Sequence, residues 1–327
     1  MTYRHWMPLD AGQLHYDLTM LALDTWDKID SGDRQNLRFR EDSITDHNLW
    51  KLAQQHSGLA VHRFDQSAEH ATGADWEWWV GSDALGWVAM RIQAKRVDAR
   101  SYRQLGHPGE RDDEYQYDTL LRSCRADAGA TYPLHVFYNG WPDTLYGGHL
   151  WPPGTPVLGC QAGCRGAPCM HVQVKSMGCA VASTSTVKLI HESGLRRNRL
   201  VRSYLPYSLP WAELFGLWQD MEDLDEPVLG WFTEKGYDSE YPGSYMALFL
   251  QRVLEALGNT PGAADFWPTV LDPREEGSMP PLHPHLPDYA NAVRYSRRQP
   301  VYSSQFETLP AAPLVSVIDV AHEGNDG

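Results

Sequence analysis

The sequence of 327 residues has no long apolar run. No segment approaches the roughly 18 consecutive apolar residues that a membrane-spanning helix requires. The stretch MTYRHWMPLDAGQLHYDL at the N-terminus also has no basic segment followed by an apolar one, as a secretory signal would. We therefore expect a cytoplasmic protein that has no membrane partner.

Cysteine and positive charge are scarce too. The five cysteines are odd in number, and three of them lie within ten residues, which suits free thiols or a metal ion better than a disulfide framework. The 28 lysines and arginines face 42 aspartates and glutamates, a net charge of −14, which excludes a surface that attracts nucleic acid all over. Basic clusters at 91–103 and 196–202 could still contact phosphate or could form a solvated face.

Apolar periodicity predicts a mixed α/β fold. Helices are expected at 11–29, 43–56, 112–128, 180–192, 210–222 and 243–258, and strands at 59–65, 74–81, 86–97 and 132–139. The three strands between 59 and 97 suggest an antiparallel meander. We expect an N-terminal helical segment over 1–37, a core over 38–204 with a Gly, Pro and Cys-rich insertion at 140–177, and a mainly helical or irregular C-terminal region over 205–327.

The stretch ATGADWEWWVG at 71–81 places two carboxylates among three tryptophans. Successive side chains of a strand point to opposite faces. Asp75, Glu77 and Trp79 would therefore share one side, and Trp76, Trp78 and Val80 the other. One face would pack against a core helix, and the other would carry acid.

The next predicted strand carries Gln93 and Lys95 on one face, and pairing of the two strands would bring Asp75 towards them. Mg²⁺ needs only one or two carboxylates and other oxygen ligands, with substrate phosphate and water completing its shell. Bound metal lowers the pKa of a ligated water, and a nearby lysine can orient that water or stabilise charge on the phosphate. The set therefore predicts phosphodiester hydrolysis.

Asp75, a strand turn and Gln93-Ala94-Lys95 together resemble the PD-(D/E)xK nuclease motif in its QxK form, as in Mrr-like restriction endonucleases. More closely, six stretches resemble, in order, the bacterial domain of unknown function 6615: EDSITD at 41–46, GADWEWW at 73–79, RIQAKR at 91–96, YDTLL at 117–121, PLHVFYN at 133–139 and GCAVA at 178–182. The resemblance covers roughly residues 38–192. It implies a restriction-endonuclease-like core, a mixed central sheet flanked by helices.

The resemblance also implies roles for single residues. Glu41 and Asp75 would hold Mg²⁺ or Mn²⁺, the carbonyl of Ala94 would be a further ligand, and Lys95 would serve the attacking water. Gln93 would replace the usual glutamate and so remove one negative charge from the metal site.

Glu77 is expected to compensate for that lost charge. The implied function is a Mg²⁺-dependent nuclease that acts on DNA rather than RNA in bacterial defence against phage or foreign DNA. A homodimer or an accessory defence subunit would be a natural partner.

A Gln-x-Lys triplet is also common on the solvent face of ordinary strands. A second one, Gln173-Val174-Lys175, occurs here without a comparable aspartate strand before it. Two other functions therefore stay open: a catalytically inactive nuclease fold that binds nucleic acid or a partner protein, and a zinc-organised interaction protein.

The segment GCQAGCRGAPCMH offers a second metal site. Cys160, Cys164, Cys169 and His171 form C-x3-C-x4-C-x-H, a ligand set that suits a structural Zn²⁺. A loop with reduced thiols and a redox disulfide are the alternatives. Cys179 is predicted to precede a helix, where its thiol could be activated, but no accompanying His and Asn or Asp are identifiable, so we expect this cysteine to pack.

Overall fold

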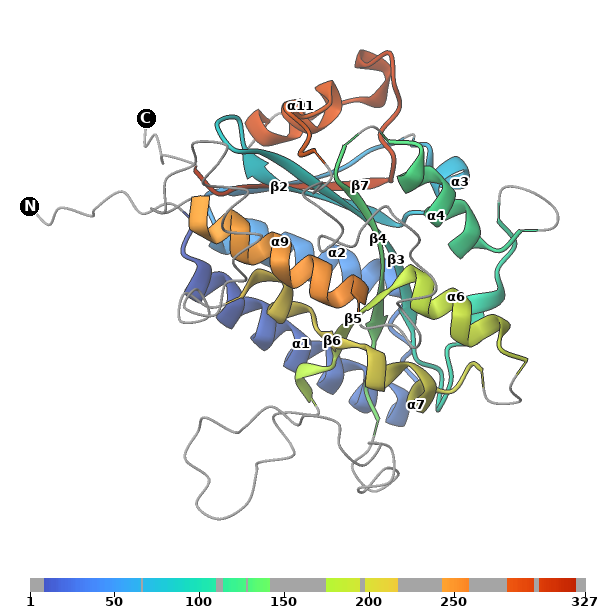
Figure 1. Ribbon diagram of the computed structural model, residues 1–327. Coiled ribbons are helices and arrows are strands. Elements are labelled where there is room, and N and C mark those ends of the chain that lie inside the picture. The colour runs from blue at the N-terminus through green and yellow to red at the C-terminus, as the bar shows by residue number, and fades with distance from the viewer. Residues whose placement is uncertain are drawn as a thin grey trace, which may run out of the picture.

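The structure is a computed structural model that describes residues 9–65, 67–109, 114–127, 129–141, 175–194, 198–216, 243–258, 281–296 and 300–321. Its strands form one mixed sheet in the order β1-β7-β2-β3-β4-β5-β6 (Figure 1). The strands are β1 (Leu59–Arg63), β2 (Trp76–Ser82), β3 (Gly86–Arg96), β4 (Thr131–Tyr138), β5 (Cys179–Ser183), β6 (Leu209–Pro210) and β7 (Leu314–Asp319). The predicted mixed α/β class is confirmed.

Helices cover both faces of this sheet. The α-helices described are α1 (Ala11–Arg34), α2 (Glu41–Gln55), α3 (Glu69–Thr72), α4 (Gln116–Arg125), α6 (Thr184–Glu192), α7 (Val201–Tyr204), α9 (Gly243–Gly258) and α11 (Asp288–Tyr295). The 3-10 helices are η1 (Arg103–Gly106), η3 (Leu205–Tyr207), η4 (Trp211–Phe215) and η6 (Ser303–Gln305). In Figure 1, α1, α2 and α9 lie on one side of the sheet and α11 on the other.

The predicted alternation puts Trp76 and Trp78 on one face of β2 and Trp79 on the other, but the face with Glu77 is buried as well, so each face of β2 belongs to a core. Trp76 and Trp78 are fully buried in the cluster on the α1, α2 and α9 side. Trp79 packs instead in the cluster on the α11 side, with its ring centroid 5.0 Å from that of His283. The partner of Trp78 is the short helix η4, since its ring lies 5.4 Å from Phe215.

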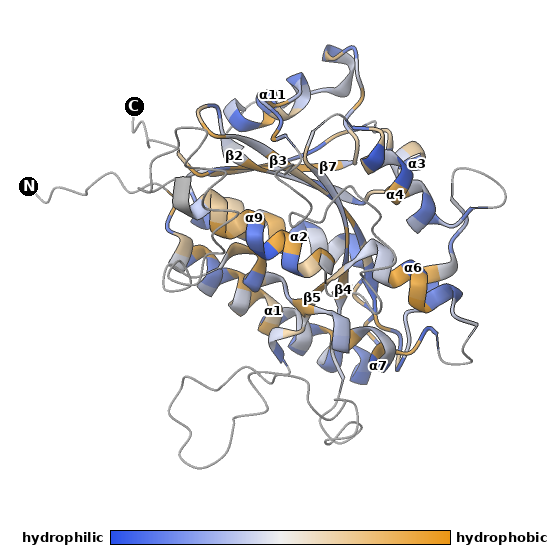
Figure 2. Cartoon of the chain, viewed as in Figure 1, coloured by the Kyte–Doolittle hydropathy of each residue, from blue (hydrophilic) through white to orange (hydrophobic). Residues whose placement is uncertain are grey.

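Helix α9 closes the larger core. Figure 2 shows it as largely hydrophobic, and residues 245–250 are all buried, whereas Glu255 near its end is exposed. A buried run of this length covers every side of a helix, so the first part of α9 lies inside the core. No helix in the described ranges combines the length and the apolarity needed to cross a membrane.

The predicted meander is wrong because a strand from the far end of the chain divides it. β7 lies between β1 and β2, antiparallel to β1 and parallel to β2. Only β2 and β3 pair as the antiparallel hairpin that the sequence predicts. The region 205–327 thus adds β6 and β7 to the sheet of the predicted core, together with α9 and α11.

The predicted helix at 180–192 is wrong in its first part. Residues up to Ser183 form β5, which pairs with β4 and β6, because the small apolar side chains fit a buried central strand. Helix α6 then starts where the Ser183 side chain accepts a hydrogen bond from Ser185 N, the usual cap. In the predicted helix 210–222, residues 211–215 form η4, and 217–242 lie outside the described residues.

Replacing Trp78 by alanine should lower the free energy of unfolding by about 3–5 kcal/mol, because it empties a large buried volume between β2 and η4. Urea denaturation followed by circular dichroism measures this. Tyr16, which is 57% exposed on α1, provides the control: Tyr16→Ala should change stability by less than about 0.5 kcal/mol. Equal losses in both variants would contradict this packing.

Candidate functional site

The site lies where β2 begins and β3 continues beyond it. Trp76 pairs with Ile92, and Asp75 N donates to Ile92 O at 2.8 Å. The N–H and C=O groups of alternate strand residues point to the same side. The amides of Ala94 and Arg96 therefore point towards the β2 side of β3, but β2 does not extend far enough to pair with them. A buried amide without a partner is costly.

Two carboxylates take the place of the missing strand. Asp75 Oδ2 accepts from Ala94 N at 2.5 Å, and Glu41 Oε1 accepts from Arg96 N at 2.7 Å. Glu41 is the first residue of α2, and Asp75 directly precedes β2. The carbonyl of Ala94 faces the same side as its amide, so oxygen atoms of all three residues converge there.

Lys95 and Gln93 project from the face of β3 that α4 covers. Lys95 Nζ donates to Gln116 Oε1 at 3.2 Å, at the first residue of α4. Gln93 Nε2 donates to Gly73 O at 3.1 Å. Gly73 has a φ of +73°, and a Cβ at this position would lie 2.7 Å from Gln116 O, so only glycine allows the chain to turn here towards Asp75.

Glu77 is held in a separate polar cluster. Its carboxylate accepts from Trp79 Nε1 at 2.8 Å, from Tyr289 OH at 2.7 Å and from Arg91 Nε at 3.3 Å. Burial raises the pKa of Glu77, while the Arg91 guanidinium opposes the shift. Its oxygens are thus already engaged, and the structure does not bring Glu77 into the lining of the cleft that contains Asp75.

A cleft of about 480 Å³ opens over Glu41, Asp75 and Ala94. Its charged lining consists of the carboxylates Glu41, Asp42, Glu69 and Asp75 and the guanidinium groups of Arg38, Arg40, Arg63 and Arg96. Gln104 also lines it, and with its amide nitrogen turned inward it lies 3.2 Å from both Glu41 oxygens. The cleft therefore presents acid at its floor with arginines around it.

The carboxylates in the cleft are costly to ionise. Burial raises the pKa of Asp75, and Lys95 and the Ala94 amide oppose that shift. Burial also raises the pKa of Glu41, with Lys95 opposing and the neighbouring Asp75 adding to it. The pKa of Glu69 is raised by burial and by Asp75, so a cation in the cleft would relieve all three groups.

These donors fit a hard divalent cation that keeps some of its waters. Within the described ranges, no group of three or more His, Cys, Asp or Glu side chains is arranged to hold a metal ion by itself. Mg²⁺, however, commonly takes only one or two carboxylates from the protein. Glu41, Asp75 and the Ala94 carbonyl meet that requirement.

The predicted zinc ligands Cys160, Cys164, Cys169 and His171 lie outside the described residues. Cys179 starts β5 rather than preceding a helix, and it is fully buried. Its thiol donates to Thr25 Oγ1 at 3.5 Å, and burial raises its pKa. Cys179 thus packs, as expected, and is not an activated nucleophile.

Sequence reasoning missed Glu69, Gln104 and Gln116. Glu69 lies on α3, which has only four residues and no apolar period to reveal it. Gln116 begins α4, but the sequence predicts a helix from 112 and so places it inside that helix; its position directly before the stretch YDTLL was the one available signal. Gln104 lies on η1, too short for a recognisable pattern.

The fold and this cleft define an α/β protein with a candidate cation site at the open side of a central strand. The chain matches the family of unknown function DUF6615 over residues 14–321, and it belongs to that family. The match extends the resemblance beyond 38–192 in both directions. No curated protein and no solved structure matches the chain.

Asp75→Asn should raise the melting temperature at neutral pH in EDTA. The raised pKa of Asp75 means that the folded state binds this proton more tightly than the unfolded state, so the wild type loses stability as pH rises through the interval between the two pKa values. Asparagine can still accept from the Ala94 amide. The gain should shrink as pH is lowered towards the ordinary carboxyl range, and Mn²⁺ should stabilise the wild type only.

Thermal melts between acid and neutral pH test this prediction. Asp27→Asn serves as the control, because Asp27 is exposed and pairs with Lys175 outside the cleft. A lower melting temperature for Asp75→Asn at neutral pH, with no response of the wild type to Mn²⁺, would show that Asp75 has only a structural role.

Proposed function

We propose that the protein is a metal-dependent nuclease with a restriction-endonuclease-like core. The observation that carries this proposal is the convergence of Glu41, Asp75 and the Ala94 carbonyl at β3, whose next residue, Lys95, is buried and interacts electrostatically with both carboxylates. Gln93 occupies the position of the second acidic residue of the PD-(D/E)xK pattern.

The chain's own groups have distinct tasks in this mechanism. Bound Mg²⁺ or Mn²⁺ would polarise the phosphodiester and lower the pKa of an attacking water. Glu41 and Asp75 would bind the cation as carboxylates. Lys95 would orient the water or stabilise charge on the phosphate, and Gln116 would hold the Lys95 ammonium in place.

The arginines around the cleft suit a phosphate backbone. Arg38 and Arg40 are more than half exposed, and their partners Asp98 and Asp42 lie at 3.6 Å and 3.3 Å. Such exposed pairs are weak, so phosphate could displace the carboxylates at little cost. The choice of DNA, and a role in defence against phage or foreign DNA, is supported by the resemblance to Mrr-like restriction endonucleases.

The wild type should cleave plasmid DNA in Mg²⁺ or Mn²⁺ and should be inactive in EDTA. Lys95→Ala should lower the cleavage rate by about 10²-fold or more, the usual cost of removing one charge-stabilising group. Gel assays with plasmid DNA, single-stranded DNA and RNA measure this and name the substrate.

Lys175→Ala is the matched control, since Lys175 ends the second Gln-x-Lys triplet and forms a 2.7 Å ion pair with Asp27. It should retain full activity. Melting curves show whether Lys95→Ala is folded. Cleavage that persists in folded Lys95→Ala, or that is insensitive to EDTA, would refute the proposed mechanism.

The second candidate function is a nuclease fold that binds nucleic acid or a partner protein without cutting. The observation that favours it is the engagement of Gln93, whose amide nitrogen is bound to Gly73 O where the nuclease pattern has a carboxylate. Retention of labelled DNA without cleavage, unaffected by Asp75→Ala, would favour this function.

We also propose that Cys160, Cys164, Cys169 and His171 bind a structural Zn²⁺, on the strength of their spacing alone. Elemental analysis should then find one zinc ion per chain, and Cys164→Ser should lose it. His285→Ala, at a histidine that is exposed, should keep it. The site would be refuted if the wild type is purified without zinc and binds none when zinc is added. Loss of partner binding in Cys164→Ser alone would favour the zinc-organised interaction protein.

A further inference from the structure

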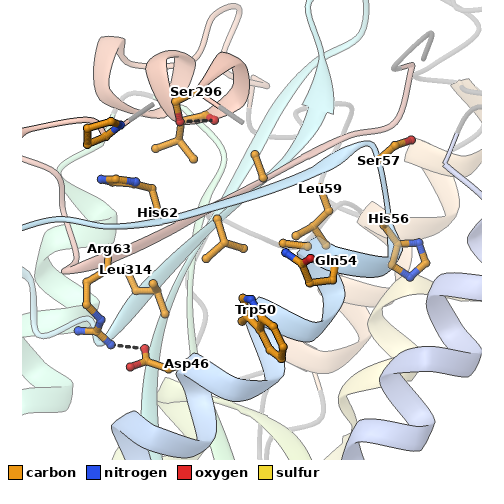
Figure 3. A pocket seen from close by; sticks show the side chains of 15 residues that line it. Asp46, Trp50, Gln54, His56, Ser57, Leu59, His62, Arg63, Ser296 and Leu314 are labelled. Carbon is orange, nitrogen blue, oxygen red and sulfur yellow. Dashed lines mark hydrogen bonds and ion pairs between the residues drawn. The ribbon is translucent and has the colours of Figure 1, made fainter. Parts of the chain in front are cut away.

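A groove of about 730 Å³ follows the outer edge of β1, at one end of the sheet. All five residues of β1 line it. Figure 3 shows Trp50 and Gln54 projecting from α2 on one side of β1, with Ser296, directly after α11, on the other. The edge of the strand is thus the floor of the groove, and two helices form its walls.

Among the described residues, part of the β1 backbone faces this groove without a hydrogen-bond partner. Ala60 and His62 face β7, because the bonds from Asp319 N to Gly58 O and from Phe64 N to Pro313 O set the parity of the ladder. Val61 and Arg63 therefore direct their N–H and C=O groups outward. No described residue pairs with that edge.

The opposite edge of the sheet, formed by β6, is poorly suited to pairing with another strand. β6 has only two residues, and one of them is Pro210, which is how natural proteins keep an edge from pairing. β1 is five residues of sequence LAVHR, without proline or lysine. Of the two edges, only β1 keeps the length and the donors that another strand needs.

We propose that β1 pairs antiparallel with β1 of a second copy of this chain, about a two-fold axis at Val61. The two sheets then become one continuous sheet. In this register the Val61 residues exchange both N–H···O bonds, and Arg63 N–H of each copy meets the Leu59 carbonyl of the other. This uses the outward groups of the edge, and a two-fold axis requires such self-complementarity.

The side chains agree with this register. Val61 lies beside Val61, a favourable β-branched pair, and Leu59 lies beside Arg63, so that no like charges face each other across the strands. Leu59 and Val61 belong to the core on the α2 side. The axis therefore brings the two α2 helices together on the same face of the joined sheet.

Trp50 is the residue of α2 that we expect to contact the second copy. It lies in the middle of α2, lines the groove and is 54% exposed, and Lys51 sits 5.4 Å from its ring centroid. Large aromatics are enriched at interfaces between subunits. In the two-fold dimer Trp50 of each copy faces α2 of the other, and its exposed ring becomes buried.

Sedimentation velocity of the full chain over a wide concentration range tests the proposal. We expect the wild type to have twice the mass of one chain. Val61→Pro should halve that mass, because proline removes the outward N–H without removing a bond to β7. Trp50→Glu should also halve it, by placing a charge in the interface, and Tyr16→Glu, at an equally exposed aromatic outside the groove, should leave the dimer intact.

Amide hydrogen exchange resolved to single residues provides the second readout. In the dimer the Val61 and Arg63 amides should be protected along with those of Ala60 and His62, and dilution to the monomer should release only Val61 and Arg63. A monomeric wild type overturns the proposal, whether its Val61 amide exchanges fast or is covered by another part of the chain. A dimer that survives both Val61→Pro and Trp50→Glu overturns it too.

Discussion

The candidate site depends on a hydrogen-bonding constraint in the sheet. β3 continues beyond the point where β2 begins. The amides of Ala94 and Arg96 therefore need hydrogen-bond acceptors from outside the neighbouring strand. Asp75 and Glu41 supply them, and this brings two carboxylates together in a place where burial makes their charge expensive. The same contacts that complete the ladder thus create a concentration of negative potential, and the cleft with its arginines is arranged around it.

The second constraint is β7, which holds β1 and β2 in one sheet. The segment before it also reaches the cleft: Pro313 lines it, and Pro310 O accepts from Ala68 N at the start of α3. Glu69 is therefore positioned by residues from the opposite end of the chain. The β2–β3 hairpin, α3 and the segment before β7 together form this side of the cleft. The stretch from Asp75 to Lys95 is therefore not sufficient to build the site.

The sequence predicts the β2–β3 hairpin, whose strands are adjacent in the chain, but not β7, whose partner strands are distant. The positions of Asp75, Gln93 and Lys95 came from alternation along two adjacent strands, and β2 and β3 do pair as a hairpin. β7 was not predictable, because its short apolar run follows a Pro-rich stretch and its partners lie more than 200 residues away in sequence. Burial of Glu77 by Tyr289 was hidden for the same reason, since α11 gives no local sign of which strand it covers.

The place of β7 has a consequence for biosynthesis. A strand that inserts between two earlier ones cannot be added until it has been translated, so β1 and β2 both keep open edges while most of the chain leaves the ribosome. Pairing over such long separations is also slow, because loop closure precedes any gain from contacts. The acidic cleft is therefore among the last parts of the molecule to assemble, and a nascent chain carries the residues of the site long before it carries the site itself.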